Sequence, residues 1–347
     1  MFIVNGRFLT QKPTGIHRYA FEVCNAMLKQ GIDFVVATPK EIRTDYDIKF
    51  KTVACGSLKT HLWEQISLPR YLKKIGSPLL VSFSGCGPLN YKNQIITIHD
   101  VSHESHPEWF AKNYYRYYAY MLPRIAKKAH AVITVSEYSK RETSRILDLD
   151  INKLHVIPCD VPTPIKEAAK HESQLLQTTD ERYILTVSSM DPRKNFVRLV
   201  QAFNNIEDRT VKLYIVGMQF KAFNTPDMQS LSGDNIVLTG YVDDARLSEL
   251  YRDAQFSIYP SLYEGFGLPP LESMTFGCPV IASDIPAIKE VNEDALLYVG
   301  DMTEKMNRLL VDENLRNELK EKGLQQVQKY SWDRTAARIV ELVSKFE

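Results

Sequence analysis

The feature of this sequence that most constrains its fold is a series of short apolar segments separated by longer stretches with helical periodicity. In the first half, these segments lie at residues 2–4, 34–36, 79–81, 95–98 and 132–135. Apolar segments without polar alternation are typical of strands buried on both faces, and long helical connections between them favour a parallel sheet. The first half of the sequence therefore predicts a doubly wound α/β unit.

A second series follows the same order, with apolar segments at residues 183–187, 212–216, 236–238, 256–259 and 279–282. A chain of 347 residues is also too long for one ordinary hydrophobic core. The sequence thus predicts an α/β protein with two doubly wound, Rossmann-like domains and a cleft between them. In such sheets ligands bind beyond the carboxyl ends of the strands, so the loops that follow strands are where functional residues are expected.

The alternation stops between Asp160 and Arg182, where prolines and then polar residues indicate an interdomain connection. We therefore expect an amino-terminal domain at 1–162 and a carboxy-terminal domain at 163–330. Residues 331–347 predict an amphipathic helix that either packs back on the first domain or stays with the second.

Composition excludes several classes of function. Lys plus Arg number 43 against 42 Asp plus Glu, and the resulting net charge of +1 argues against a nucleic-acid partner. The cysteines are scattered and odd in number, which argues against a disulfide framework or a zinc cage: Cys24, Cys55, Cys86, Cys159 and Cys278. No apolar stretch approaches the roughly 20 residues that span a bilayer, and no signal peptide is apparent. A soluble cytoplasmic protein is the expectation.

The most informative segment runs from residue 259 to 279. A strand is expected to end near Pro260, two glycines permit a sharp turn, and Pro269 and Pro270 suit the first positions of a helix that Gly277 closes. The exposed amides at such a helix start can hold an anion, here a diphosphate.

Two glutamates flank this turn. Glu264 is expected in the glycine loop and Glu272 in the first turn of the helix, so the two carboxylates must serve different purposes. One could accept hydrogen bonds from a sugar and the other from a ribose. The alternative is that one satisfies loop amides and the other caps the helix, but the joint occurrence with Gly-Phe-Gly and Pro-Pro favours ligand binding.

A glutamate, seven residues and a second glutamate after a strand and a Gly-x-Gly turn resembles the signature of the GT4-type retaining glycosyltransferases of GT-B fold. The resemblance implies that Glu264 contacts hydroxyls of the donor sugar and that Glu272 binds the ribose. It also implies that the amides of Gly265, Phe266 and Gly267 line the sugar and phosphate site. Residues 1–162 would then form the acceptor side and residues 163–330 the nucleotide-sugar side.

A basic pair, Arg193 and Lys194, follows the first strand of the second series. Such cations could stabilise the charge that develops on a departing diphosphate, although a solvated pair on a loop is the alternative. The resemblance supports the first interpretation, because bacterial mannosyltransferase-like members of the family carry a similar Pro-Arg-Lys-Asn run. Lys194 matches directly. The second arginine of several members falls where this sequence has residues 188–190, so Arg193 matches less directly.

Two features of the first half carry the same resemblance. Residues 12–19 resemble a Gly-Ile-Gly-Arg-Tyr loop that approaches the donor phosphates, which places Gly15 near them, with His17 where glycine is usual. His17 is interpreted either as a ligand or as a surface histidine. The strand at 95–98 ends in His99, which the resemblance puts near the reacting sugar.

A metal site is an alternative for five residues near that strand end: His99, Asp100, His103, Glu104 and His106. The resemblance instead implies a metal-independent enzyme without a cofactor, with a nucleoside-diphosphate sugar as co-substrate.

Two other segments leave alternatives open. The loop at 239–244 either places Tyr241 and Val242 against a nucleobase, as the resemblance implies, or merely caps the next helix. A predicted helix at 109–128 is rich in aromatic and basic residues. It could contact an anionic lipid of the inner membrane or a glycan acceptor, while core packing with a solvated basic face is the competing interpretation.

Together these features predict a retaining hexosyltransferase acting in cell-surface polysaccharide assembly, such as that of lipopolysaccharide. The donor would be a GDP- or UDP-hexose, with mannose from GDP-mannose as the favoured candidate. The acceptor would be a glycan or a lipid-linked oligosaccharide. A nucleotide-sugar epimerase of the same fold and a catalytically silent nucleotide-sugar-binding partner are the alternatives.

Overall fold

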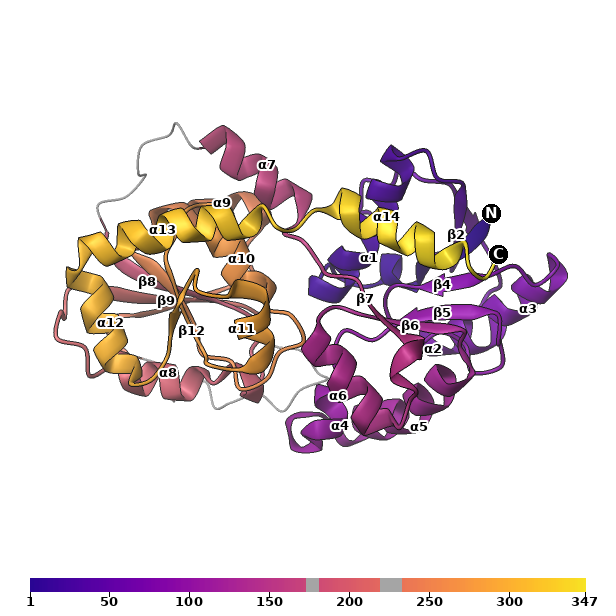
Figure 1. Cartoon of the computed structure of the whole chain (residues 1–347), viewed down its shortest axis with the longest axis horizontal. Helices are drawn as coiled ribbons and strands as arrows, with labels where there is room; N and C mark the ends of the chain where they lie inside the picture. Colours follow the sequence, from indigo (N-terminus) through magenta and orange to yellow (C-terminus); the bar gives the residue numbers. More distant parts are fainter. Residues whose placement is uncertain (173–180, 219–232) are drawn as a thin grey trace. The chain divides into compact units, whose positions relative to one another are not determined.

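The computed structural model describes residues 1–172, 181–218 and 233–347, which form two compact α/β units (Figure 1). The first unit comprises residues 1–105, 115–160 and 331–347. The second unit comprises residues 106–114 and 161–330.

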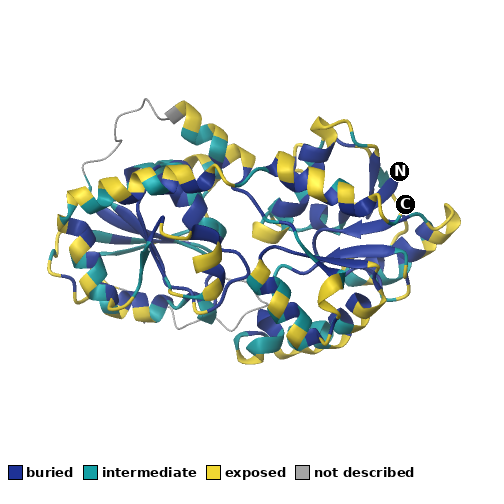
Figure 2. Ribbon diagram, in the orientation of Figure 1, coloured by how far each residue is buried: buried dark blue, intermediate teal, exposed yellow. Residues whose placement is uncertain are grey.

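The first unit is built on a seven-stranded sheet in the order β3-β2-β1-β4-β5-β6-β7, in which every pair is parallel. Its strands are β1 (Phe2–Asn5), β2 (Phe34–Thr38), β3 (Thr52–Ala54), β4 (Leu80–Ser82), β5 (Gln94–Thr97), β6 (Ala131–Thr134) and β7 (Leu154–Val156). Apart from the edge strands β3 and β7, each is buried along its whole length (Figure 2), as strands covered on both faces require. This confirms the predicted parallel α/β architecture.

Helices connect these strands and cover the sheet. They are η1 (Gly6–Thr10), α1 (Gly15–Lys29), α2 (Thr60–Leu62), the π-helical turn η2 (Trp63–Ser67), α3 (Leu68–Lys74), α4 (Ser102–Ser105), α5 (Lys112–Lys128), α6 (Glu137–Leu147) and η4 (Ile151–Lys153). The carboxy-terminal helix α14 (Trp332–Val343) packs on α1. Its first residues are anchored to the segment after β7, because the Trp332 amide donates to Asp160 Oδ2 at 3.2 Å and Thr335 Oγ1 donates to the Pro158 carbonyl at 2.8 Å.

The second unit is built on a six-stranded parallel sheet in the order β10-β9-β8-β11-β12-β13. Its strands are β8 (Tyr183–Val187), β9 (Lys212–Val216), β10 (Ile236–Gly240), β11 (Phe256–Tyr259), β12 (Val280–Ala282) and β13 (Leu297–Tyr298). Apolar side chains of β8, β9, β11 and β12 form one core cluster with α8 and α12.

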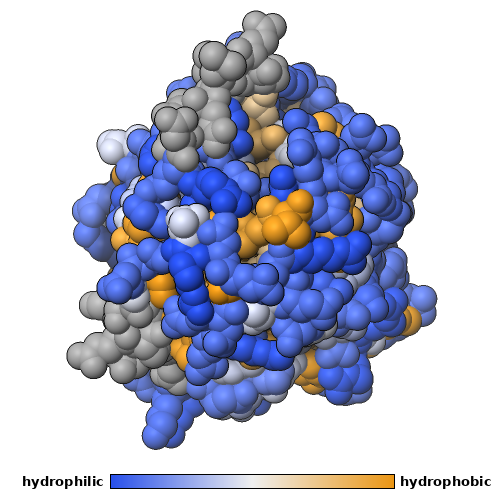
Figure 3. All heavy atoms as spheres, turned by 90° about the vertical axis from the view of Figure 1, so that its left-hand side faces the viewer, coloured by the Kyte–Doolittle hydropathy of each residue, from blue (hydrophilic) through white to orange (hydrophobic). Residues whose placement is uncertain are grey.

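The helices of this unit are η3 (Pro107–Trp109), α7 (Thr163–Glu172), η5 (Pro192–Lys194), α8 (Phe196–Phe203), α9 (Asp244–Asp253), α10 (Leu268–Thr275), α11 (Pro286–Asn292), α12 (Met302–Val311) and α13 (Glu313–Val327). Helix α7 lies in the stretch expected to be only a connection, and it packs against α9 and α10. On the face of the molecule in Figure 3, hydrophilic residues predominate and apolar residues form small separate patches. Within the described residues, none of the helices combines the length and apolar character required to cross a bilayer.

Each sheet has one point at which the order of its strands reverses. In the first sheet the chain winds outward from β1 to β3 and then returns to place β4 on the other side of β1. In the second sheet the same reversal occurs between β8 and β11. Loops that leave neighbouring strands in opposite directions open a crevice at such a point, which is where doubly wound sheets bind ligands.

Candidate active site

A buried ion pair lies at the point of reversal in the second sheet. Lys194 ends η5, shortly after β8, and Glu264 follows β11. Lys194 Nζ donates to Glu264 Oε1 at 2.5 Å and to the Tyr259 hydroxyl at 2.9 Å, and that hydroxyl donates to the same Glu264 oxygen at 2.8 Å. The structure therefore brings together two of the predicted catalytic residues and adds Tyr259, which sequence reasoning did not select.

The two charges are held almost out of solvent, with Lys194 5% and Glu264 7% exposed. Burial lowers the pKa of Lys194, and the attraction of Glu264 offsets this effect only in part. Burial raises the pKa of Glu264, but Lys194, Arg193 and the Tyr259 hydroxyl outweigh it, so the pKa lies below its usual range. The carboxylate is consequently ionised and acts as a hydrogen-bond acceptor at neutral pH.

The local backbone explains why the loops after β8 and β11 meet. Asn195 adopts a left-handed conformation with φ of 60°, which ends η5 and lets α8 begin at the next residue. The Leu262 amide donates to the Arg193 carbonyl at 2.7 Å, and Asn195 Nδ2 donates to the Pro260 carbonyl at 3.3 Å. Strained non-glycine residues of this kind are concentrated at functional sites.

Arg193, the other member of the predicted basic pair, is held by an acid. Its Nε donates to Asp191 Oδ1 at 3.1 Å, and Ser189 Oγ donates to Asp191 Oδ2 at 2.7 Å. Asp191 is fully buried and the Arg193 side chain is 14% exposed. The guanidinium therefore has a fixed position, and its exposed fraction can meet an anion.

The predicted glycine turn and helix follow Glu264. Gly267 has φ of 95°, which favours glycine, and precedes α10; a Cβ at that position would lie 2.4 Å from Ile288 Cδ1, so Ile288 would have to move. Pro269 and Pro270 occupy the first turn, where an amide donor is not needed. Gly265 and Phe266 are both buried in the turn.

The sequence predicted Glu272 in the first turn of this helix, but the structure places it beyond that turn. Helix α10 begins at Leu268, one residue before the proline pair, which makes Glu272 its fifth residue. The carboxylate is half-buried, and the buried Tyr251 hydroxyl donates to its Oε2 at 3.0 Å. A capping role for Glu272 is thereby excluded, because a cap precedes the helix.

For the loop between β10 and α9, the sequence left open a helix cap or a nucleobase contact by Tyr241 and Val242. Asp243 caps α9 by accepting a hydrogen bond from the Arg246 amide at 2.8 Å. Tyr241 is 58% exposed and Val242 is half-buried. The loop therefore caps α9 through Asp243, and the Tyr241 side chain lies exposed two residues before that cap.

In the first unit, His99 follows β5, and Gly15 begins α1. His99 Nε2 lies 3.0 Å from the Phe83 carbonyl, and the Tyr19 ring meets the imidazole edge-on at 4.8 Å. Burial lowers the pKa of His99, so the ring is neutral and Nε2 is the donor to Phe83. Gly15 is the exposed first residue of α1.

His17, which stands where the resembled loop has glycine, is not a surface histidine. Its Nδ1 lies 2.8 Å from Thr14 Oγ1 and 3.0 Å from the Lys12 carbonyl, so the ring closes the turn that begins α1. Burial lowers the pKa of His17 to about 4. The imidazole is therefore neutral at physiological pH and stabilises the loop.

The alternative of a metal site finds no support in the geometry. Among the described residues, no group of three or more His, Cys, Asp or Glu side chains is arranged to hold a metal ion. Asp100 instead accepts hydrogen bonds from the Ser102 amide and hydroxyl at 2.9 and 2.7 Å, while His106 stacks on Trp109.

A cavity of about 330 Å³ lies elsewhere in the second unit, beside β8, β9 and α9. Its acids are already paired, since Glu181 contacts Lys212 and Tyr214, and Glu249 contacts Arg246 at 2.6 Å. It shares no lining residue with the Lys194–Glu264 site, so we assign the chemistry to the latter.

Comparison with known proteins agrees with this geometry. A family model described as Glycosyltransferase Family 4 matches residues 13–163, and one described as Glycosyl transferases group 1 matches residues 167–326. O-antigen chain mannosyltransferase B of Escherichia coli is 28% identical over 73% of this chain and 70% of its own length. O-antigen chain mannosyltransferase RfbU of Salmonella typhimurium is 27% identical over 87% and 88%. The serotype-specific mannosyltransferase WbdA of Escherichia coli is matched over only 29% of its length.

Solved structures show the fold. Sucrose-phosphate synthase from Thermosynechococcus elongatus superposes with a TM-score of 0.75 at 21% identity and covers 99% of this chain and 98% of its own. WaaG, a glycosyltransferase involved in lipopolysaccharide biosynthesis, has a TM-score of 0.71 at 14% identity with the same coverage. Anabaena HepE in complex with UDP and glucose has a TM-score of 0.71 at 14% identity and covers 99% of both chains.

Two doubly wound sheets with this strand order define a protein of GT-B fold. More particularly, the chain belongs to the GT4 family of retaining, group 1 glycosyltransferases and is a distant relative of bacterial O-antigen mannosyltransferases.

Proposed function

We propose that the protein transfers mannose from GDP-mannose to a glycan or lipid-linked oligosaccharide during cell-surface polysaccharide assembly. Two relatives of similar sequence are named as O-antigen chain mannosyltransferases, which supports both the sugar and the pathway. A UDP-hexose is the competing donor, because the structural relative HepE binds UDP and glucose.

The observation that carries this proposal is the Lys194–Tyr259–Glu264 network beside the start of α10. Lys194 and Arg193 are proposed to bind the diphosphate, since a preorganised cation stabilises charge that develops on a leaving group. Glu264, ionised and near the glycine turn, accepts hydrogen bonds from sugar hydroxyls.

The remaining donor contacts complete this assignment. The amides of Gly265, Phe266 and Gly267 line the sugar and phosphate positions, where the dipole of α10 favours an anion. Glu272 binds the ribose hydroxyls, and the loop of Tyr241 and Val242 lies against the nucleobase. Tyr251 fixes the Glu272 carboxylate for that purpose.

In the first unit, His99 is proposed to bind the reacting sugar and Gly15 to approach the phosphates. A neutral imidazole whose Nε2–H is committed to the Phe83 carbonyl has Nδ1 left as an acceptor for a hydroxyl. Retention then follows when the acceptor attacks the face from which the diphosphate departs. No carboxylate is assigned as a covalent nucleophile.

We also propose that α5 contacts the inner membrane surface. Its sequence contains no acidic residue, and exposed Lys112, Arg116, Tyr120 and Arg124 recur every fourth position on one face. The opposite face contributes to the core of the first unit. Each basic residue near an anionic bilayer contributes about 1 kcal/mol to binding. Co-sedimentation with phosphatidylglycerol vesicles, but not phosphatidylcholine vesicles, tests this contact.

A donor panel tests the function. The purified protein is incubated with GDP-mannose, GDP-fucose, UDP-glucose and UDP-N-acetylglucosamine, each with and without a mannose-containing oligosaccharide acceptor. Release of GDP from GDP-mannose only when acceptor is present supports the proposal. Consumption without acceptor would indicate an epimerase, and binding without turnover a silent partner.

A further inference from the structure

The first sheet has a buried polar network at its own point of strand reversal. Asn5 ends β1 and Ser82 ends β4, the two strands between which the order reverses. Asn5 Nδ2 donates to Glu64 Oε1 at 2.8 Å and to Ser82 Oγ at 3.2 Å. Glu64, carried by the π-helical turn η2, therefore joins a third segment to these strand ends.

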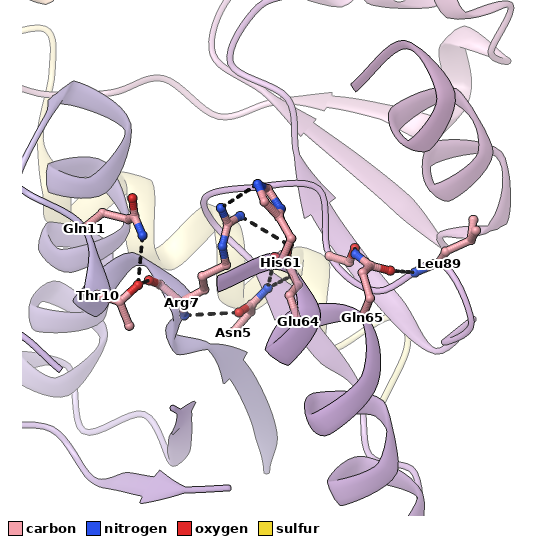
Figure 4. Close-up of polar contacts among 10 residues, drawn as sticks. Asn5, Arg7, Thr10, Gln11, His61, Glu64, Gln65 and Leu89 are labelled. Carbon is pink, nitrogen blue, oxygen red and sulfur yellow. Dashed lines mark hydrogen bonds and ion pairs between the residues drawn. The ribbon is translucent and has the colours of Figure 1, made fainter. Parts of the chain in front are cut away.

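Arg7 completes the network from η1. Its Nη1 donates to Glu64 Oε2 at 3.2 Å, and its Nη2 lies 3.2 Å from His61 Nε2 (Figure 4). The backbone makes room for this pair, because a Cβ on Gly85 would lie 3.0 Å from both Arg7 Nη1 and Glu64 Oε1. Gly85 also has φ of 75°, a conformation that other residues rarely adopt.

The two charges are buried to different depths. The Glu64 side chain is 0% exposed, Arg7 13% and His61 36%. Glu64 is thus inaccessible, whereas the guanidinium and the imidazole reach the surface above it. Because Glu64 is the most buried of the three, it can hold Arg7 but not touch a ligand. Arg7 and His61 are the side chains that a ligand can contact.

Stability alone does not account for such a pair. Replacing a buried ion pair by apolar side chains is often neutral or stabilising, so its presence is weak evidence of a structural role. Arg7 Nε is moreover buried without a hydrogen-bond partner among the described residues, while His61 Nδ1 faces Glu64 Oε2 at 3.8 Å. Unsatisfied buried polar groups are rare in folded proteins and call for a specific explanation.

The chemistry of the cluster favours a neutral, hydroxyl-rich ligand over an anion. Glu64 already neutralises Arg7. At the donor site the proposed diphosphate contacts also include Arg193 and the amides before α10, which have no counterpart among Asn5, Arg7, His61, Glu64 and Ser82, so a phosphate would gain less net attraction here. Guanidinium groups only donate hydrogen bonds, and a hydroxyl oxygen can accept them, whereas His61 Nε2 already accepts from Arg7. The Tyr117 ring lies 4.3 Å from the His61 ring and adds a flat apolar surface of the kind that one face of a sugar ring can cover.

The second unit repeats this arrangement at its donor site. There a cation that follows the central strand, Lys194, meets a buried acid, Glu264, at the point where the strand order reverses. Arg7 follows β1, one of the two strands between which the order of the first sheet reverses. Both sheets therefore place a cation and a buried acid at the point of reversal.

We propose that the cluster of Arg7, His61 and Glu64 is the binding site for the sugar acceptor. Arg7 and His61 contact hydroxyls of the acceptor, and Glu64 is a positioning residue that holds the guanidinium. The inference rests on the proposed glycosyltransfer for the identity of the ligand as acceptor.

Saturation-transfer NMR without donor tests the site directly, with methyl glycosides of mannose, glucose, galactose and rhamnose as probes. We expect at least one glycoside to bind the wild-type protein and its affinity to fall about 10- to 100-fold in Arg7→Ala, as loss of a hydrogen bond to a charged group predicts. Glu64→Gln, which keeps the shape of the side chain, should also weaken binding. Arg43→Ala is the matched control, because it removes an exposed pair with Asp45 in the same unit.

Kinetics separate this role from a structural one. In variants that fold, the KM for the acceptor rises while the KM for the donor and kcat stay close to wild type. Arg7→Lys keeps the charge opposite Glu64 but not the planar fork, so it remains folded and shows an intermediate loss even if Arg7→Ala does not fold. An equal loss of donor affinity, an unchanged acceptor KM, or no glycoside binding to the wild type overturns the inference. Glycoside binding without transfer from any donor would instead contradict the proposed function alone.

Discussion

The ion pair at the donor site makes a double-mutant cycle informative. Lys194→Met and Glu264→Gln each remove one charge and leave the other buried. At 2.5 Å, an effective dielectric constant of about 20 gives an attraction of about 7 kcal/mol before desolvation is subtracted. Breaking a buried pair typically costs about 3–5 kcal/mol of unfolding free energy, which we expect for each single variant.

The double variant is expected to lose less than the sum of the singles, with a coupling of about 3 kcal/mol, because neither charge is left alone. Urea unfolding followed by circular dichroism gives these free energies, and hydrogen exchange in β8 and β11 shows whether the loss is local. Tyr259→Phe is the control, since it keeps both charges and removes one hydroxyl, at a cost of about 1 kcal/mol.

Across the variants of this cycle, we expect kcat/KM for transfer not to change in parallel with the free energy of unfolding. We expect kcat/KM to fall by about 10²- to 10³-fold in Lys194→Met, the size of effect that removal of one transition-state contact produces. The double variant should remain inactive even though its stability partly recovers. If it regained activity, or if the two losses of stability were additive, Lys194 and Glu264 would not form the coupled catalytic pair.

Three other perturbations have defined outcomes. Gly267→Ala should lower the unfolding free energy by about 1–3 kcal/mol more than Gly240→Ala in chemical denaturation, because both have positive φ but only the former brings a Cβ against Ile288. The pKa of His17 is lowered to about 4, so wild-type stability should decline relative to His17→Asn as the pH falls from about 6.5 towards 4, by about 1 kcal/mol per pH unit. A flat difference across that range would contradict the burial of His17. The pKa of Glu64 lies below its usual range, because Arg7 and hydrogen bonds outweigh burial; its advantage over Glu64→Gln should therefore hold above about pH 4.3 and disappear as the pH falls further in acid unfolding curves.

The sequence predicted the interior of both sheets and the edge strand β10, but it missed the edge strands β3 and β13. Strands such as β1 and β8 are continuous apolar runs because both of their faces are covered. Strand β3 alternates exposed and half-buried residues, and β13 has only two residues, so neither produces a comparable run. Helix α7 was missed for a related reason: its one proline, Pro164, and its charges suit a surface helix as well as a linker.

The same contrast holds for the site. Glu264 and Lys194 were predicted because each lies in a local pattern, a glycine turn and a basic pair after a strand. Glu64 has no such pattern, and it meets Arg7 only because the fold brings together residues 57 positions apart. The available signal was Arg7 itself, which follows the first strand where functional loops are expected.

Glu264 at the donor site and Glu64 in the Arg7 cluster are proposed to have different roles. Lys194 and Glu264 are nearly equally exposed, and in the proposed donor site each of them contacts the ligand. Glu64 lies beneath Arg7 and cannot reach a ligand, whichever sugar is bound. A carboxylate that contacts the substrate must be positioned to accept hydrogen bonds from the substrate's hydroxyls. A carboxylate that only holds an arginine must be positioned to accept them from the guanidinium. We therefore expect replacement of Glu264 to alter which donor is used, and replacement of Glu64 to weaken acceptors of different kinds alike.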